Sequence, residues 1–160
     1  MGLLKSLLGK STERQNYYNY NSASYKEMEK ANAKYYNGLD KIESMWSVMY
    51  NLKSYAGSNA DKFEAICCEN IKDLGIMINA QKNANYGSSI PLHVPAYVRL
   101  TMLYEKREDY EKAINICADA IRAGFIGDGS KGKMYGRLAR LIRKSGLDVD
   151  SDISKLIEEK

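Results

Sequence analysis

Apolar residues recur at steps of three and four along most of the chain, the pattern of helices with one face in a core. The first clear runs span residues 39–52 and 63–78. Two shorter runs follow between Pro95 and Gly124, and two more lie within residues 133–159. No segment alternates between apolar and polar residues as a strand does. The pattern therefore predicts an all-α protein.

Residues that start and stop helices divide the pattern further. Ser24 and Glu27 have the spacing of a capping box, which predicts a helix that begins near Tyr25. Asn37-Gly38 predicts a break or a kink in that helix. Residues 83–92 are rich in turn-forming residues and predict the longest internal loop.

The first 24 residues differ in character from the rest. Four leucines share one short face beside two lysines: Leu3, Leu4, Leu7 and Leu8, with Lys5 and Lys10. An Asn- and Tyr-rich stretch follows without any period. We expect residues 1–24 to form a short amphipathic helix and a flexible linker, ahead of a single helical-repeat domain in residues 25–160. The short helix is expected to touch a membrane surface or to dock on a partner.

A repeat-like spacing stands out in residues 95–125. The first predicted helix there has an aromatic residue, a leucine, a small residue and a tyrosine at fixed steps: Tyr97, Leu100, Thr101 and Tyr104. The second has two alanines around a cysteine: Ala113, Cys117 and Ala120. This spacing resembles one unit of the tetratricopeptide-repeat family. Thr101, Cys117 and Phe125 depart from that family's usual glycine, aromatic residue and proline.

The resemblance implies an antiparallel hairpin whose small residues let two helices approach closely. Residues 39–74 are expected to form an irregular earlier hairpin, with Ala65 and Cys68 at second-helix positions. Residues 132–145 would then cap the open end of the stack. The predicted fold is thus a set of stacked antiparallel helical hairpins, a tetratricopeptide-like solenoid fragment with a C-terminal capping helix.

Composition supports helices and narrows the classes of function. The chain has 14 Ala and 14 Leu but only four Val and two Pro, which favours helices over strands. No apolar run approaches the roughly 20 residues of a membrane-spanning helix. Three cysteines and no signal peptide indicate a reducing cytoplasm. The Lys, Asn, Ile and Tyr bias suits a low-GC bacterium or its phage.

Motifs that resemble catalytic or metal sites each lack an essential part. Residues 127–134 have the spacing of a phosphate-binding loop, but a helix precedes them and Met134 occupies the hydroxyl position. Acidic residues 148–159 lack the glycine of a calcium loop and instead suit a helix start. The cysteines and His93, the one histidine, have no zinc-ligand spacing. We therefore expect no catalytic residue, no metal and no cofactor.

Stacked hairpins form grooves that bind peptides or partner helices without chemistry. We therefore expect a non-catalytic protein–protein interaction module, an adaptor or an inhibitor, with a protein or peptide as its partner. The expected groove residues are first-helix positions that point away from the packing stripe: Asn51, Arg99, Met102 and Lys106.

A row of cations supports an alternative class of function. It occupies one side of the predicted fifth helix: Lys133, Arg137, Arg140 and Lys144. With a net charge of +4 and basic ends, the chain would then bind nucleic acid or another anionic surface. A solvated helix face gives the same pattern, and acidic residues 148–159 are expected to fold back against it.

Overall fold

The computed structural model describes residues 22–87 and 90–158, and six α-helices make up most of this part of the chain. They are α1 (Ala23–Leu52), α2 (Ser58–Asn83), α3 (Pro95–Lys106), α4 (Tyr110–Arg122), α5 (Lys133–Ser145) and α6 (Ser151–Glu158). Within the described residues, the only β-structure is an isolated bridge between His93 and Gly127. The all-α prediction is confirmed.

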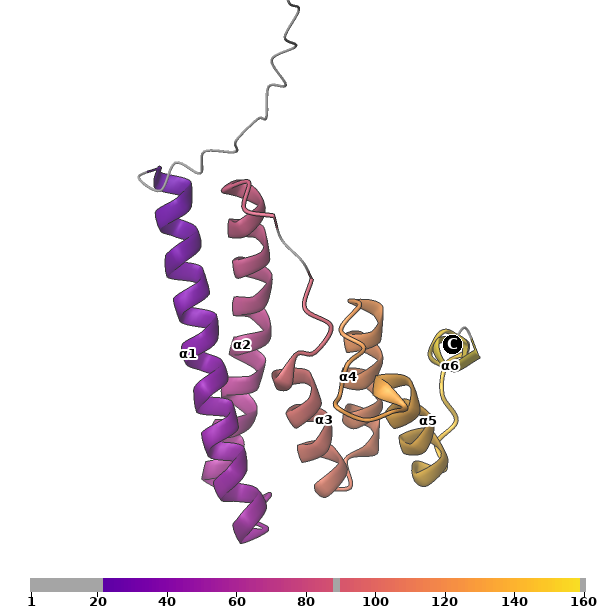
Figure 1. Cartoon of the computed structure of the whole chain (residues 1–160). Helices are drawn as coiled ribbons and strands as arrows, with labels where there is room; N and C mark the ends of the chain where they lie inside the picture. The colour runs from indigo at the N-terminus through magenta and orange to yellow at the C-terminus, as the bar shows by residue number, and fades with distance from the viewer. Residues whose placement is uncertain (1–21, 88–89, 159–160) are drawn as a thin grey trace, which may run out of the picture.

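From α1 to α5 successive helices pack against one another with antiparallel directions, whereas α6 is seen end-on and crosses its neighbours (Figure 1). The helices α1 and α2 are much longer than the others and form an arm that extends well past α3 and α4 (Figure 1). Near one end of the arm, α3 contacts both α1 and α2. The α5 helix packs on α4, and α6 closes the row against α4 and α5.

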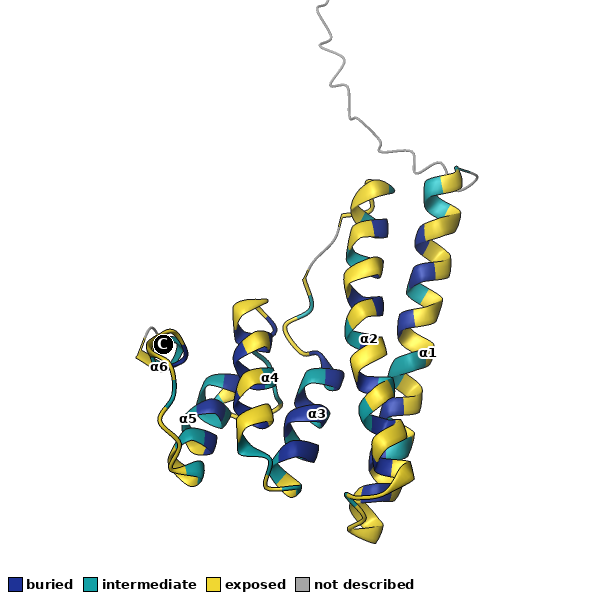
Figure 2. Ribbon diagram, turned by 180° about the vertical axis from the view of Figure 1, so that it is seen from behind, coloured by how far each residue is buried: buried dark blue, intermediate teal, exposed yellow. Residues whose placement is uncertain are grey.

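Buried residues follow the inner faces of the pairs, while the outward faces are exposed (Figure 2). Tyrosine and methionine contribute to this core together with the aliphatic residues. The buried examples are Met28, Tyr35, Met49, Met77, Tyr104 and Met134.

The predicted break at Asn37-Gly38 is wrong, because α1 continues through both residues without interruption. Asn70 of α2 packs against Gly38 so closely that a Cβ there would lie 2.5 Å from the Asn70 amide nitrogen. That nitrogen donates a hydrogen bond of 2.8 Å to the Tyr35 carbonyl one turn away. Packing against α2 therefore outweighs the low helix propensity of glycine.

The predicted start of α1 is also two residues too late. Ser22 is the N-cap, and its hydroxyl accepts a hydrogen bond of 3.2 Å from the Tyr25 backbone N–H. Ser24 already lies inside the helix, so the predicted linker ends earlier than residue 24. The predicted N-terminal helix lies outside the described residues.

Later boundaries agree with the sequence. Pro95 occupies the first turn of α3, where its missing N–H costs nothing. Gly124 follows α4 with a φ of 85°, a conformation that favours glycine. The earlier hairpin exists as α1 and α2, but its predicted second-helix positions are wrong. Ala65 and Cys68 are exposed, and Cys67 lies in the core instead.

The two alanines of the α3–α4 region allow a direct test of its packing. Ala113 and Ala120 are fully buried, so Ala113→Leu and Ala120→Leu should each lower the free energy of unfolding by about 1–3 kcal/mol. Chemical denaturation measures this change. Ala65→Leu, the same substitution at an exposed position of α2, should be nearly neutral. Unchanged stability in both buried-site variants would contradict the packing of α3 against α4.

Candidate functional site

Arg99, one of the predicted groove residues, joins α3 to α1. Its Nε and Nη2 atoms lie 3.0 and 2.8 Å from the two carboxylate oxygens of Glu43. Its guanidinium also lies over the Trp46 ring, 5.5 Å from the ring centroid. A bidentate, stacked arginine of this kind fixes the orientation of two helices.

The other predicted groove residues are only partly brought together. Met102 is half-buried beside Arg99, 3.7 Å from its Nη1 atom. Lys106 follows on the same face of α3 and lies over the Tyr55 ring at 5.8 Å. Asn51 is exposed near the end of α1. Three of the four residues thus share one face of α3, and Asn51 stands apart from it.

A second connection between the arm and α3 involves Glu64 of α2, which the sequence did not single out. Its carboxylate accepts hydrogen bonds from the Tyr104 hydroxyl at 2.7 Å and from Arg107 at 2.6 Å. Arg107 also donates to the Tyr55 carbonyl and to Asp61. Burial and the Glu64 carboxylate both raise the pKa of Tyr104, so its hydroxyl remains a donor at neutral pH.

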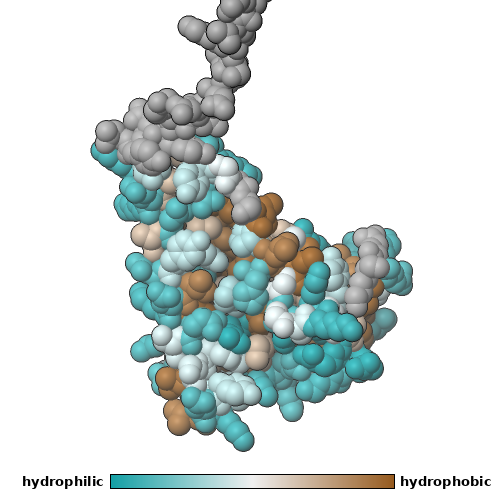
Figure 3. All heavy atoms as spheres, viewed as in Figure 1, coloured by the Kyte–Doolittle hydropathy of each residue, from teal (hydrophilic) through white to brown (hydrophobic). Residues whose placement is uncertain are grey.

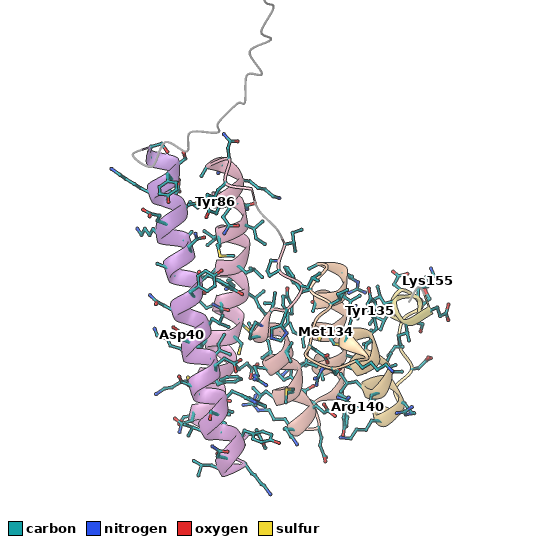
Figure 4. All side chains as sticks on the ribbon, in the orientation of Figure 1. Asp40, Tyr86, Met134, Tyr135, Arg140 and Lys155 are labelled. Atoms are coloured by element: carbon teal, nitrogen blue, oxygen red, sulfur yellow. The ribbon has the colours of Figure 1, made fainter. Side chains whose placement is uncertain are left out.

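The predicted cation row consists mostly of residues held in ion pairs. Arg137 lies 2.9 Å from Asp128, and both side chains are nearly buried, at 11% and 2% exposure. Arg140 and Lys144 approach Glu105 of α3 at 3.4 and 3.5 Å, with Arg140 labelled on α5 in Figure 4. Lys133 is exposed at the start of α5. The sequence had indicated residues 148–159 as the acidic partners of this row. The structure instead pairs the row with Glu105 and Asp128.

The cysteines and His93 occupy separate environments. Cys67 and Cys117 are buried, and Cys68 is exposed. Burial raises the pKa of the Cys117 thiol to about 12, which disfavours the thiolate at neutral pH. His93 is exposed, and its Nδ1 atom lies 3.1 Å from the Gly127 carbonyl. Within residues 22–87 and 90–158, no three His, Cys, Asp or Glu residues are placed to hold a metal ion.

A cleft of about 400 Å³ lies where the arm meets the segment that leads into α3. Hydrophobic side chains gather in this region of the surface (Figure 3), and Tyr86 lies beside the arm after α2 (Figure 4). The side chains that line the cleft come from α1, from the C-terminal half of α2 and the residues just after it, and from residues 91–95: Tyr35, Tyr36, Leu39, Met77, Gln81, Tyr86, Pro91, His93 and Pro95.

The cleft wall formed by residues 91–95 is hydrogen-bonded to Gly127, in the segment after α4. The Gly127 N–H donates a hydrogen bond of 2.6 Å to the Leu92 carbonyl, and His93 contacts the Gly127 carbonyl. A Cβ at residue 127 would lie only 3.0 Å from the Leu92 oxygen, so a larger residue would require a shift of a few tenths of an ångström in this close approach. Residues 83–92 and Gly127 lie in loops that are distant in the sequence, and no local sequence signal reveals the hydrogen bond between Leu92 and Gly127.

The cleft continues the face that was predicted to form the groove. Pro95 precedes Arg99 by one helical turn on α3, and Leu39 precedes Glu43 by one turn on α1. The opening thus lies one turn from the Arg99–Glu43 ion pair, toward the N-terminal ends of α1 and α3.

The chain matches no protein-family model, no curated protein and no solved structure. None of the helices in the described part of the chain is long and apolar enough to cross a membrane.

Substitution of Arg137 tests whether the cation row stabilises the fold rather than binding a ligand. Arg137→Ala leaves a buried carboxylate without its cation and should cost about 3 kcal/mol of stability. Lys133→Ala, at an exposed position, should change stability by less than about 0.5 kcal/mol. Both values come from urea denaturation at pH 7.

The pH dependence of the Arg137→Ala variant gives a second, independent result. Burial alone would raise the pKa of Asp128, but hydrogen bonds from Ser130 and the Arg137 charge hold the pKa below its ordinary value of 3.8. This carboxylate therefore stabilises the fold above the pKa of the unfolded chain, and the contribution is lost as the pH falls through the lower folded-state pKa. The cost of Arg137→Ala should accordingly shrink at acidic pH. A cost that stays constant from pH 7 to pH 3 would contradict this account.

Proposed function

We propose that this protein is a non-catalytic interaction module that holds a segment of a partner protein in the cleft between the arm and residues 91–95. The observation that carries the proposal is the exposure of aromatic and apolar side chains around a preformed hollow of about 400 Å³. Pockets of this size and character are typical of binding sites, in which a few polar groups fix the orientation of the occupant.

The chemistry of the lining suits a protein partner. Tyr36 is 54% exposed, and a tyrosine ring offers a large apolar surface with one hydroxyl, which is why tyrosine is frequent at interface hot spots. Met77 and Leu39 give the cleft an adaptable apolar floor. Gln81 and His93 supply polar atoms at its edge. We infer that an apolar or aromatic side chain of the partner fills the cleft.

The finer fold assignment belongs to the same proposal. We take α3 and α4 as one tetratricopeptide-like hairpin stacked on the α1–α2 pair. The complete burial of Thr101, at the small-residue position of α3, supports this assignment, as does the contact of the Tyr97 and Phe125 rings at 5.5 Å. A stack of such pairs serves adaptors and inhibitors alike, since both present a preformed concave surface to a partner.

The proposal is tested with a peptide selected from a random display library against the full chain. The amide signals that shift when the peptide binds should belong to the cleft, and Tyr36→Ala should weaken the peptide's Kd about tenfold or more. Tyr50→Ala is the matched control, since Tyr50 lies on the same helix, is 53% exposed and also touches a neighbouring ring. It should leave the Kd within about twofold. Shifts confined to other surfaces, or equal losses in both variants, would refute the cleft as the binding site.

Salt dependence distinguishes this proposal from nucleic-acid binding. Binding in an apolar cleft should change little between 50 and 200 mM salt. A protein with six to ten phosphate contacts loses about 10³–10⁵ in affinity over that range. If the chain binds nucleic acid with so steep a salt dependence, nucleic-acid binding by its basic ends and its cation row replaces protein binding in the cleft as the proposed function.

A further inference from the structure

Two hollows lie one after the other on a flank of the arm. The first has a volume of about 320 Å³ and is lined on α1 by Lys34, Gly38 and Lys41. The second has about 330 Å³ and is lined on α1 by Met45 and Val48. These positions follow one another at three- and four-residue steps, so both hollows lie along a single stripe of α1. Together they are called the outer groove below.

The outer groove lies on the opposite side of α1 from the proposed partner cleft. Glu43 contacts α3, and at 3.6 residues per turn Met45 lies about 160° around the helix from it. On α2, the groove is lined by Ile66, whereas Glu64 faces α3. Occupation of the outer groove is thus independent of the proposed function.

Two apolar side chains of this stripe are largely exposed. Val48 is 58% exposed, and Leu52, one turn further along the stripe, is 71% exposed. Met45 and Ile66 are half-buried and pack against the core. A row of apolar side chains along one helix face is favourably covered by another apolar surface.

The floor of the groove also holds a buried polar atom that needs a donor. Asn70 is 1% exposed, and its Nδ2 atom donates to the Tyr35 carbonyl. Its Oδ1 atom has no hydrogen-bond partner. Gly38 leaves this part of α1 without a side chain, at the edge of the first hollow.

We propose that residues 3–8 of the same chain bind in the outer groove. Four of these six residues are leucines that share one face, which matches the apolar stripe of Met45, Val48 and Leu52. In the first hollow the carboxylates of Glu69 and Asp73 are already paired with Lys34. The occupant thus matches the groove in its hydrophobicity.

The length of the connecting chain permits this docking. Residues 9–22 number 14 and, fully extended, span up to about 46–50 Å. The stripe from Ala23 to Val48 covers 25 helical steps, or about 38 Å. A tethered segment also has an effective concentration of about 1 mM at its site. A second copy of the chain or a membrane surface has no such advantage at ordinary protein concentrations.

The test places a nitroxide next to the leucines of the full chain. Ser11→Cys supplies the attachment site in a Cys68→Ser background, because Cys68 is the exposed one of the three cysteines. With the segment docked at about 1 mM effective concentration, paramagnetic broadening of amide signals in residues 41–52 should exceed that in α4 about fivefold or more. Val48→Glu should abolish this excess. Leu147→Glu, which places the same charge at another exposed apolar residue, should leave it unchanged.

Three results would overturn the proposal. The first is equal broadening along all helices, or broadening that Val48→Glu does not change. The second is broadening that is purely intermolecular. It would appear when isotope-labelled chains without nitroxide are mixed with unlabelled chains that carry the nitroxide, and it would show that a second copy occupies the groove. The third is broadening that appears only when anionic phospholipid vesicles are added, which would assign the leucines to a membrane surface. Peptide binding in the partner cleft is measured separately and is unaffected by any of these results.

Discussion

The contact on which this architecture depends is the polar junction between the arm and α3. Glu64 accepts hydrogen bonds from both Tyr104 and Arg107, and Glu43 binds Arg99 in bidentate fashion. These groups are partly shielded from water, so their attraction is stronger than that of exposed pairs. Apolar contacts around Trp46 hold the helices together, whereas directional hydrogen bonds fix how they are oriented.

The junction determines which surfaces of the arm stay open. Because α3 is shorter than α1 and α2 and is held near one end of them, the far part of the arm has no helix against it (Figure 1). On the α3 side this leaves the cleft around Tyr36 and Tyr86. The outer groove beside Val48 lies level with α3 but on the opposite flank of α1, so α3 does not cover it. The side of the arm on which α3 packs, together with its short length, thus leaves two separate faces of the arm uncovered by the other described helices.

The sequence predicted the elements better than the contacts between them. Hydrophobic period and the stop signal at Gly124 identified helices because both are local. The uninterrupted α1 was missed because Gly38 is stabilised there by Asn70, a residue 32 positions away. Arg99 was predicted to point away from the packing stripe, whereas it lies at the junction of α3 with α1, because its ion pair with Glu43 depends on a docking angle that no local pattern encodes. The cleft was missed for the same reason, since its wall depends on the pairing of Gly127 with Leu92.

A double-mutant cycle on Glu64 and Arg107 tests the junction most directly. The single variants Glu64→Gln and Arg107→Met, together with the double variant, give the coupling free energy by chemical denaturation. The reference is the exposed pair of Arg122 and Asp119, for which such a cycle should give about 0.5 kcal/mol or less. The partly buried Arg107–Glu64 pair, with its 2.6 Å separation, should give more than about 1 kcal/mol. A coupling no larger than that of the exposed pair would contradict the account.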